Sequence, residues 1–259
     1  MNTKGKNSTF ALVLAAAGIG SRFGGKSPKQ FQELLDLPLY MWSIFTMGQL
    51  DEISYIVVAT TASDVEKVTG DITNILKGTD LEVLLKKIFV IPGGDTRQAS
   101  VYEGLKYLTQ FSPEYVLVHD AARPFVDKSS VKDIIESITT YGAATLAIPV
   151  TDTIKLIEDK EIKETLDRSV LMSAQTPQGA KFEWLLKAHE KANAKALQVT
   201  DDAALLELEN KVVRIVIGSK SNIKITVKED MIIGQSIAKD VFGQINALLR
   251  TKNNLTSEF

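Results

Sequence analysis

The chain has 259 residues, of which 44% are hydrophobic, and its formal net charge is -2. This composition is normal for a globular protein with a sizeable core, and the near-neutral charge gives no general reason to expect nucleic acid as a partner. The sequence has no cysteine, which excludes disulfides, thiolate metal sites and cysteine nucleophiles and favours a reducing, cytoplasmic location.

The first apolar stretch begins at Phe10 and allows two interpretations. Lys4 and Lys6 ahead of residues 10–17 have the form of a short signal peptide, with residues 15–17 as the cleavage site. The same residues also form a good first strand that leads into a glycine-rich loop, and we prefer this second interpretation. No apolar run approaches the roughly 20 residues that a membrane-spanning helix needs.

Apolar strands alternate with helical patterns over most of the chain. The predicted strands are residues 10–14, 54–60, 88–91, 115–118, 143–150, 212–217 and 222–226. The predicted helices cover about 38–47, 64–77, 96–108, 131–138 and 181–196, with one more opening at Thr200 and a last one ending near Leu249. This alternation predicts an α/β, Rossmann-like fold, in which helices flank a mostly parallel sheet.

The alternation breaks at Thr151. Residues 154–157 and 162–166, joined by a turn at residues 158–160, predict a β-hairpin that projects from the sheet. Because two strands alone are marginally stable, we expect this arm, residues 150–171, to pack on another surface such as a second subunit. No linker, repeat or low-complexity tract interrupts the rest, so residues 1–259 are predicted to form a single domain that carries the arm.

Polar clusters follow three of the predicted strands, at residues 18–29, 93–100 and 120–123. In open parallel sheets, ligands bind beyond the carboxyl ends of the strands, so the three clusters are expected to form one site. The first cluster combines glycines, which let a backbone approach a ligand and expose its N–H groups, with Arg22, Lys26 and Lys29. This combination predicts a loop that binds a polyphosphate.

Two other nucleotide-binding patterns fit part of this loop. Gly18 and Gly20 begin a dinucleotide fingerprint, but Phe23 stands where that fingerprint needs glycine. Residues 20–27 match the phosphate-loop NTPase pattern, and Asp120 would supply its acid. Pro28 argues against this second pattern, because a proline disfavours a helical conformation at the residue before it. A phosphate-loop NTPase stays an alternative, as does a nucleotide-binding module without catalytic activity.

The loop resembles the signature of sugar nucleotidyltransferases, in which an Ala-Ala-Gly-x-Gly-x-Arg turn is followed by Pro-Lys-Gln or Pro-Lys-Pro. Ala16-Ala-Gly-Ile-Gly-Ser-Arg22 and Pro28-Lys-Gln30 fit it. Further motifs then follow in the order of one family, at residues 93–100, 119–124, 149–155, 167–168, 174–178, 200–203 and 222–226. Over nearly its whole length, the chain is therefore similar to the 2-C-methyl-D-erythritol 4-phosphate cytidylyltransferases of the non-mevalonate isoprenoid pathway.

The resemblance implies a reaction in which a polyol phosphate and CTP give a CDP-alcohol and pyrophosphate. A phosphate oxygen attacks the α-phosphorus in line, so that positioning and cations dominate the catalysis. A ribitol-5-phosphate cytidylyltransferase is the nearest alternative, because it shares the fold, the loop and the arm. Residues 151–155 and 200–203 look closer to the erythritol enzymes.

The same resemblance implies roles for individual residues. The implied catalytic residues are Arg22, Lys29 and Lys224. The implied nucleotide-binding residues are Ala16, Ala17, Gly18, Gly94, Asp95 and Ser100. The residues implied around the second substrate are Asp120, Arg123, Thr153, Arg168 and Thr200. Thr153 and Arg168 lie on the arm, which implies a homodimer whose arms reach into the partner's site. Mg²⁺ would bridge the triphosphate, with Asp120 as its candidate protein ligand.

Each of these residues also has an ordinary structural explanation. Lys224 follows Ile223 and precedes Ile225, and the alternation of a strand would simply point this lysine to solvent. Asp120 and Thr200 could cap helices, and Arg123 could pair with a neighbouring acid. We expect His119, which follows a buried strand, to be a structural hydrogen-bonding group and not a catalytic base.

Overall fold

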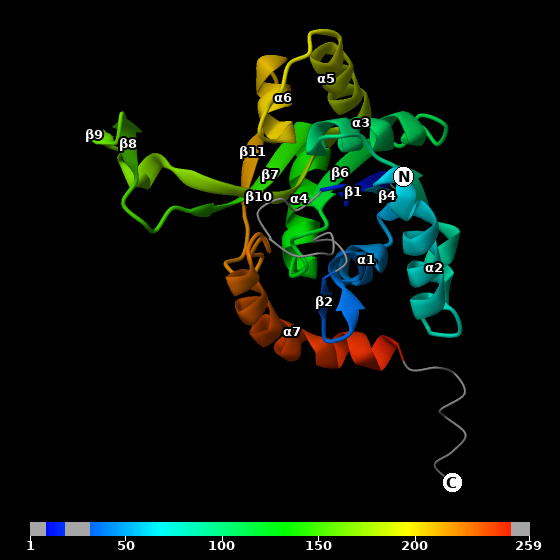
Figure 1. Ribbon diagram of the computed structural model, residues 1–259. Helices are drawn as coiled ribbons and strands as arrows, with labels where there is room; N and C mark the ends of the chain where they lie inside the picture. Colours follow the sequence, from blue (N-terminus) through cyan, green and yellow to red (C-terminus); the bar gives the residue numbers. More distant parts are fainter. Residues whose placement is uncertain (1–8, 19–31, 250–259) are drawn as a thin grey trace, which may run out of the picture.

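The computed structural model describes residues 9–18 and 32–249. A seven-stranded sheet forms the centre of the molecule (Figure 1). Its strands, in spatial order, are β11 (Arg214–Ile217), β7 (Ala143–Pro149), β10 (Met172–Lys181), β6 (Tyr115–Asp120), β1 (Phe10–Ala15), β4 (Ile53–Thr60) and β5 (Ile88–Pro92). All neighbouring strands pair in parallel except β10, which is antiparallel to both β6 and β7. The predicted mostly parallel sheet is confirmed.

Helices cover both faces of the sheet (Figure 1). One core contains Leu12 and Leu14 of β1 and apolar residues of α1, α2, α4 and α7. The opposite core contains Ala11 and Val13 of β1 and residues of α3, α5 and α6. The helices are α1 (Leu39–Gly48), α2 (Val65–Leu76), α3 (Arg97–Leu108), α4 (Lys128–Tyr141), α5 (Phe182–Ala194), α6 (Asp202–Leu208) and α7 (Lys228–Leu248). Because successive side chains of β1 point to opposite faces, an apolar run without alternation suits a strand that is covered on both sides.

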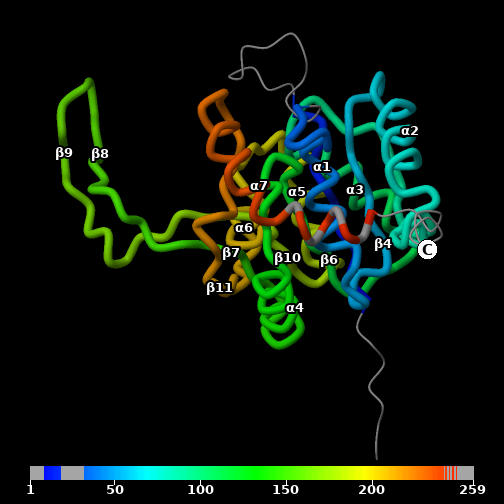
Figure 2. The backbone as a smooth tube through the Cα atoms, turned by 90° about the horizontal axis from the view of Figure 1, so that it is seen from below, coloured from blue at the N-terminus to red at the C-terminus, as the bar shows by residue number. Residues whose placement is uncertain are grey.

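The arm leaves the sheet between β7 and β10 and stands away from the body in both views (Figures 1 and 2). Its hairpin consists of β8 (Lys155–Glu158) and β9 (Glu161–Thr165), which pair antiparallel, and every residue of both strands is exposed. A second short hairpin, β2 (Glu33–Leu34) and β3 (Leu37–Pro38), precedes α1. The predicted projecting hairpin is confirmed.

The structure corrects the sequence-based prediction at two segments. The motif at residues 174–178 belongs to β10, a strand that we did not predict, because buried polar residues such as Gln175 and Gln178 hide its strand pattern. Residues 222–226, predicted as a last strand, are not in a strand. Their backbone N–H groups form no ladder with a neighbouring strand: the Ile225 N–H donates to the Ala122 carbonyl at 2.8 Å, and the Thr226 N–H donates to Asp230 Oδ2 at 2.6 Å.

Within the part of the chain that the structure describes, no helix combines the length and the apolar character that crossing a membrane requires.

Candidate active site

The carboxyl ends of four parallel strands are joined by backbone hydrogen bonds. The Ala16 N–H donates to the Ala59 carbonyl at the end of β4, at 2.8 Å, and the Ala121 N–H donates to the Ala15 carbonyl at 3.1 Å. The Gly93 N–H, just after β5, donates to the Thr60 carbonyl at 2.6 Å. The three polar clusters predicted from the sequence therefore all begin at one edge of the sheet, although the first is described only up to Gly18.

The residues predicted to bind the nucleotide lie at the β1 and β5 ends of this edge. A Cβ atom on Gly93 would lie 2.8 Å from Ser100 Oγ and 3.1 Å from Ala17 Cβ, so this glycine allows two predicted motifs to meet. Gly94 is equally restricted, since a Cβ atom there would lie 2.5 Å from Ala99 Cβ. A side chain at Gly93 would push Ala17 and Ser100 away, and one at Gly94 would collide with the first turn of α3.

Ser100 stabilises the loop after β5. Its side chain is buried, and its hydroxyl accepts a hydrogen bond from the Gly94 N–H at 3.2 Å and lies within donating distance of the Gly94 and Thr96 carbonyls. Gly18 and Asp95 are exposed at the same edge. Direct contact of these residues with a nucleotide stays a prediction.

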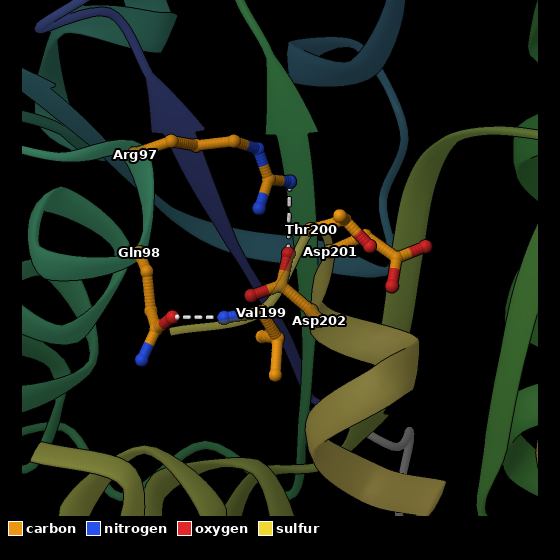
Figure 3. A pocket seen from close by; sticks show the side chains of 6 residues that line it. All are labelled: Arg97, Gln98, Val199, Thr200, Asp201 and Asp202. Atoms are coloured by element: carbon orange, nitrogen blue, oxygen red, sulfur yellow. Dashed lines mark hydrogen bonds and ion pairs between the residues drawn. The ribbon is translucent and has the colours of Figure 1, made fainter. Parts of the chain in front are cut away.

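A row of paired charges crosses the carboxyl end of β6. Lys224 Nζ lies 2.6 Å from Asp120 Oδ2, and Arg97 Nε donates to Asp120 Oδ1, also at 2.6 Å. Arg97 Nη2 then lies 2.8 Å from Asp202 Oδ2 at the start of α6 (Figure 3). Asp202 Oδ1 lies 3.0 Å from His189 Nε2 on α5. Lys224 and Asp120, predicted separately from distant parts of the chain, are brought into direct contact.

The charges in this row stabilise one another. Burial alone would raise the pKa of the Asp120 carboxyl, but Arg97 and Lys224 outweigh burial and hold that pKa well below its usual range. Burial likewise opposes ionisation of Asp202, and Arg97 and His189 outweigh it and lower the pKa of the Asp202 carboxyl. For Arg97, burial would lower the pKa of the guanidinium, and the two carboxylates raise it. Both carboxylates are therefore ionised at neutral pH.

Arg97 is a candidate site residue that the sequence analysis did not single out. It lies inside the motif at residues 93–100, so its position was noted but its role was not. The sequence contains no indication of this role, because both acids that contact Arg97 come from other segments: Asp120 ends β6 and Asp202 begins α6.

Among residues 9–18 and 32–249, Arg123 forms no ion pair with an acid. Its Nη1 donates to the Asn222 carbonyl at 2.8 Å and its Nη2 to the Ala174 carbonyl at 3.3 Å. Burial lowers the pKa of this guanidinium, with Asp120 opposing and Arg97 reinforcing the effect. Arg123 thus ties the loop after β6 to the segment that carries Lys224, and contact with a substrate stays a prediction.

His119 is fully buried and its hydrogen bonds fix its tautomer. Nε2 lies 2.9 Å from the Arg123 carbonyl, which can only accept, so Nε2 carries the proton. Nδ1 then accepts from the Thr176 hydroxyl at 3.0 Å, and that hydroxyl oxygen accepts from the Asp120 N–H at 3.1 Å. These contacts give His119 a structural role and orient the backbone at Asp120.

Acid should destabilise the protein through His119. Burial lowers the pKa of this imidazole to about 4, against 6.5 in the unfolded chain. Between pH 6.5 and 4, His119 therefore binds a proton in the unfolded state but not in the folded state. Its contribution to the unfolding free energy is complete above pH 6.5 and falls progressively down to pH 4. We expect a loss of about 3 kcal/mol in unfolding free energy over this window, measurable by urea denaturation.

A His119→Gln variant provides the control for this titration. It should be less stable than the wild type at pH 7, because the paired hydrogen bonds are disturbed. Its stability should also fall less steeply between pH 6.5 and 4, since the titrating group is gone. Parallel curves for the two proteins would contradict the assignment.

Thr200 lies one residue before the N-cap of α6, which corrects the prediction that Thr200 caps this helix. The capping residue is Asp201, whose Oδ1 accepts from the Ala204 N–H at 3.0 Å. Thr200 is exposed and lines a small pocket together with five further residues (Figure 3). These are Arg97, Gln98, Val199, Asp201 and Asp202. The pocket therefore adjoins the row of paired charges.

Within the described residues, neither Thr153 nor Arg168 hydrogen-bonds to this edge of its own chain. Arg168, in a 3₁₀ turn at Arg168–Val170, donates from Nη1 to the Thr151 carbonyl at 2.6 Å and so links the two sides of the arm. Thr153 is exposed beside β8. The hairpin between them projects away from the sheet (Figure 2). Arg22 and Lys29 lie outside the described residues.

The described residues do not form a protein cage for a metal ion. Residues 9–18 and 32–249 contain no group of three or more His, Cys, Asp or Glu side chains that could hold one. Each oxygen of Asp120 contacts one cation, and Asp120 as a Mg²⁺ ligand stays a prediction.

Comparisons with known proteins agree with this geometry. The family model described as 2-C-methyl-D-erythritol 4-phosphate cytidylyltransferase matches residues 10–240. The enzyme of that name from Desulforamulus reducens is 42% identical over 89% of this chain and 96% of its own. The one from Bacillus cereus is 36% identical over 89% of this chain and 98% of its own.

Solved structures give the same result. The crystal structure of 4-diphosphocytidyl-2C-methyl-D-erythritol synthase from Anaerococcus prevotii superimposes with a TM-score of 0.77 at 28% identity, covering 90% of this chain and 97% of that one. The 2-C-methyl-D-erythritol 4-phosphate cytidylyltransferase from Thermus thermophilus gives 0.70 at 28% identity, with 88% and 98% covered. The chain belongs to the 2-C-methyl-D-erythritol 4-phosphate cytidylyltransferase family.

Proposed function

We propose that this chain transfers CMP from CTP to 2-C-methyl-D-erythritol 4-phosphate and releases pyrophosphate, a step in isoprenoid precursor synthesis. Membership of the family supports the reaction. The observation that links this reaction to residues of this chain is the contact between Lys224 and Asp120. It lies at the strand edge where Ala17 and Gly93 also meet. The enzyme is thus a cytidylyltransferase.

The reaction asks the protein for positioning and positive charge. A phosphate oxygen of the methylerythritol phosphate forms a bond to the α-phosphorus of CTP, and the bond from that phosphorus to the bridging oxygen of the β-phosphate breaks. The leaving pyrophosphate takes the electron pair, so that no covalent enzyme intermediate is needed. We assign to Lys224 the stabilisation of charge on the transferring phosphoryl group. The same role for Arg22 and Lys29 is part of the proposal.

Mg²⁺ enters this proposal as a companion of CTP. It usually keeps several waters and binds substrate phosphates with few protein ligands, which agrees with the pairing of both Asp120 oxygens. The ion would neutralise charge on the triphosphate. A cytoplasmic location stays a prediction from the cysteine-free sequence.

We further propose that the chain works as a homodimer through its arm. Ile157 and Ile162 are each 63% exposed and Val170 is 77% exposed, although an isolated two-stranded hairpin with apolar side chains in water is marginal. A second copy that covers these side chains would stabilise the arm. In such a dimer, Thr153 and Arg168 would reach the partner's substrate, as the family resemblance implies.

The test is pyrophosphate release by the purified protein with Mg²⁺ and CTP. Release with methylerythritol phosphate and not with ribitol 5-phosphate is the expected result. A preference for ribitol 5-phosphate would keep the mechanism and change the substrate. ATP hydrolysis without any alcohol phosphate would instead favour a phosphate-loop NTPase, and binding of CTP without turnover would favour a silent nucleotide-binding module.

A further inference from the structure

In the row of paired charges at the end of β6, the inner residues are placed so that they could position the outer ones. Along it, positive and negative groups alternate from the edge of the sheet into the fold, in the order Lys224, Asp120, Arg97 and Asp202. His189 Nε2 lies against Asp202 at the inner end. Lys224 is 39% exposed, whereas Asp120 and Asp202 are 9% and 3% exposed. The outer end of the row faces solvent and the inner end lies in the core.

Arg97 forms ion pairs with two buried carboxylates, so it is not a free ligand for phosphate. One edge of its guanidinium contacts Asp120 Oδ1 and another contacts Asp202 Oδ2. We propose that Arg97 is a positioning residue that locks the Asp120 carboxylate in place, so that the other oxygen of Asp120 holds the Lys224 ammonium at the reacting edge. Arg97 acts on the reaction through these two residues.

The inner end of the row is fixed to the fold. Gln178 Oε1, on β10, accepts from the N–H groups of Asp202 and Ala203, both at 3.0 Å, and Gln178 Nε2 donates to Asp201 Oδ2 at 2.8 Å. β10 pairs directly with β6, the strand that ends in Asp120. Both carboxylates that Arg97 bridges are therefore anchored to neighbouring strands, and their separation is set by the sheet.

Arginine suits this position for a chemical reason. Its planar guanidinium has several donors in a rigid fork and bridges two carboxylates, while a lysine ammonium is a point charge on a flexible stem. An Arg97→Lys variant keeps the positive charge between two buried acids and loses the bridge. The Asp120 carboxylate then becomes free to rotate, and Lys224 loses its fixed partner.

The first test measures the environment of Lys224 and needs no substrate. The full-length protein is treated with a limiting amount of an amine-acylating reagent, and labelling of each lysine is followed by mass spectrometry. In Arg97→Lys, Lys224 should be labelled faster than in the wild type, whereas Lys220, an exposed lysine of the same segment, should be unchanged. A Lys106→Ala variant, on α3 but outside the row of paired charges, is the matched control and should behave as the wild type.

The second test is kinetic and rests on the proposed function. Arg97→Lys should lower kcat by about 10- to 100-fold and leave the KM for CTP within a few-fold. In a Lys224→Ala background, the same substitution should cost less than about threefold, because residues that act through one another are not additive. A purely structural role would cost the same factor in both backgrounds.

An Asp202→Asn variant repeats both tests and can replace Arg97→Lys if that variant fails to fold. It removes a negative charge and hardly changes the size of the side chain. It should show the same faster labelling of Lys224. Unchanged or slower labelling of Lys224 in a folded variant would overturn the inference, whatever the kinetics. A wild-type protein that releases no pyrophosphate would refute the proposed function, while the labelling result would still decide the role of Arg97.

Discussion

Lys224→Ala should lower kcat by about 10²- to 10³-fold while the dissociation constant for CTP changes by only a few-fold. The reason lies in where the charge develops. Lys224 is held by Asp120 at 2.6 Å and its side chain is 39% exposed, so its ammonium is fixed at the edge and still open to a ligand. An interaction made mainly in the transition state lowers turnover and spares ground-state binding.

The measurement combines pyrophosphate release under saturating substrates with calorimetric titration of CTP in the presence of Mg²⁺. Lys220→Ala, four residues away in the sequence and also exposed, is the control and should leave both quantities unchanged. Equal losses of turnover and of CTP affinity would remove Lys224 from the transition state and make it an ordinary binding residue.

Two inactive variants should restore each other when they share a dimer. A heterodimer of Lys224→Ala and Arg168→Ala chains contains one site with an intact Lys224 and an intact arm from the other chain. We expect that heterodimer, isolated by tandem affinity tags, to recover about half of the wild-type activity per dimer, because one of its two symmetry-related sites is complete. Each homodimeric variant should stay nearly inactive.

The reverse arrangement makes the experiment decisive. A heterodimer of wild-type chains with chains that carry both substitutions should be nearly inactive if the arm serves the partner, since neither site is then complete. If the arm served its own chain, the two heterodimers would exchange their results. A protein that sediments as a monomer at micromolar concentration would contradict the dimer itself.

The alternation of strands and helices was predictable because the sheet is buried on both faces. β1 is a continuous apolar run, and β7 is apolar except for Thr145. Thr96 illustrates how local the signal is: the predicted helix opens there, and in the structure Thr96 caps α3, accepting from the Ala99 N–H at 3.0 Å. Local chemistry of this kind needs no knowledge of the tertiary structure.

β10 was missed because its burial is polar. Gln175, Thr176 and Gln178 are nearly inaccessible, and each is satisfied by partners from remote segments. A search for periodic apolar residues does not detect a strand whose buried side chains are polar. Residues 222–226 show the opposite error, since Ile223 and Ile225 alternate like a strand while their backbone partners lie in loops.

The candidate site was predictable as a set of segments and not as a network. The position of Asp120 after a strand and the motif around Lys224 were enough to select both residues. Their pairing, and the bridging of Asp120 to Asp202 by Arg97, depend on how β6, α3 and α6 meet in space. Such contacts between distant segments leave no mark on the pattern of a single sequence.

The arm begins and ends at neighbouring points of the sheet, because Pro149 of β7 is paired with Met172 of β10. Everything between these residues is, in topological terms, one long loop across an antiparallel pair, and the cost of closing a loop rises only slowly with its length. The arm is thus a separable module. Its length and sequence can diverge without altering the register of the sheet, so the surface that the proposed dimer would use can evolve while the edge at the ends of β1, β4, β5 and β6 stays as it is.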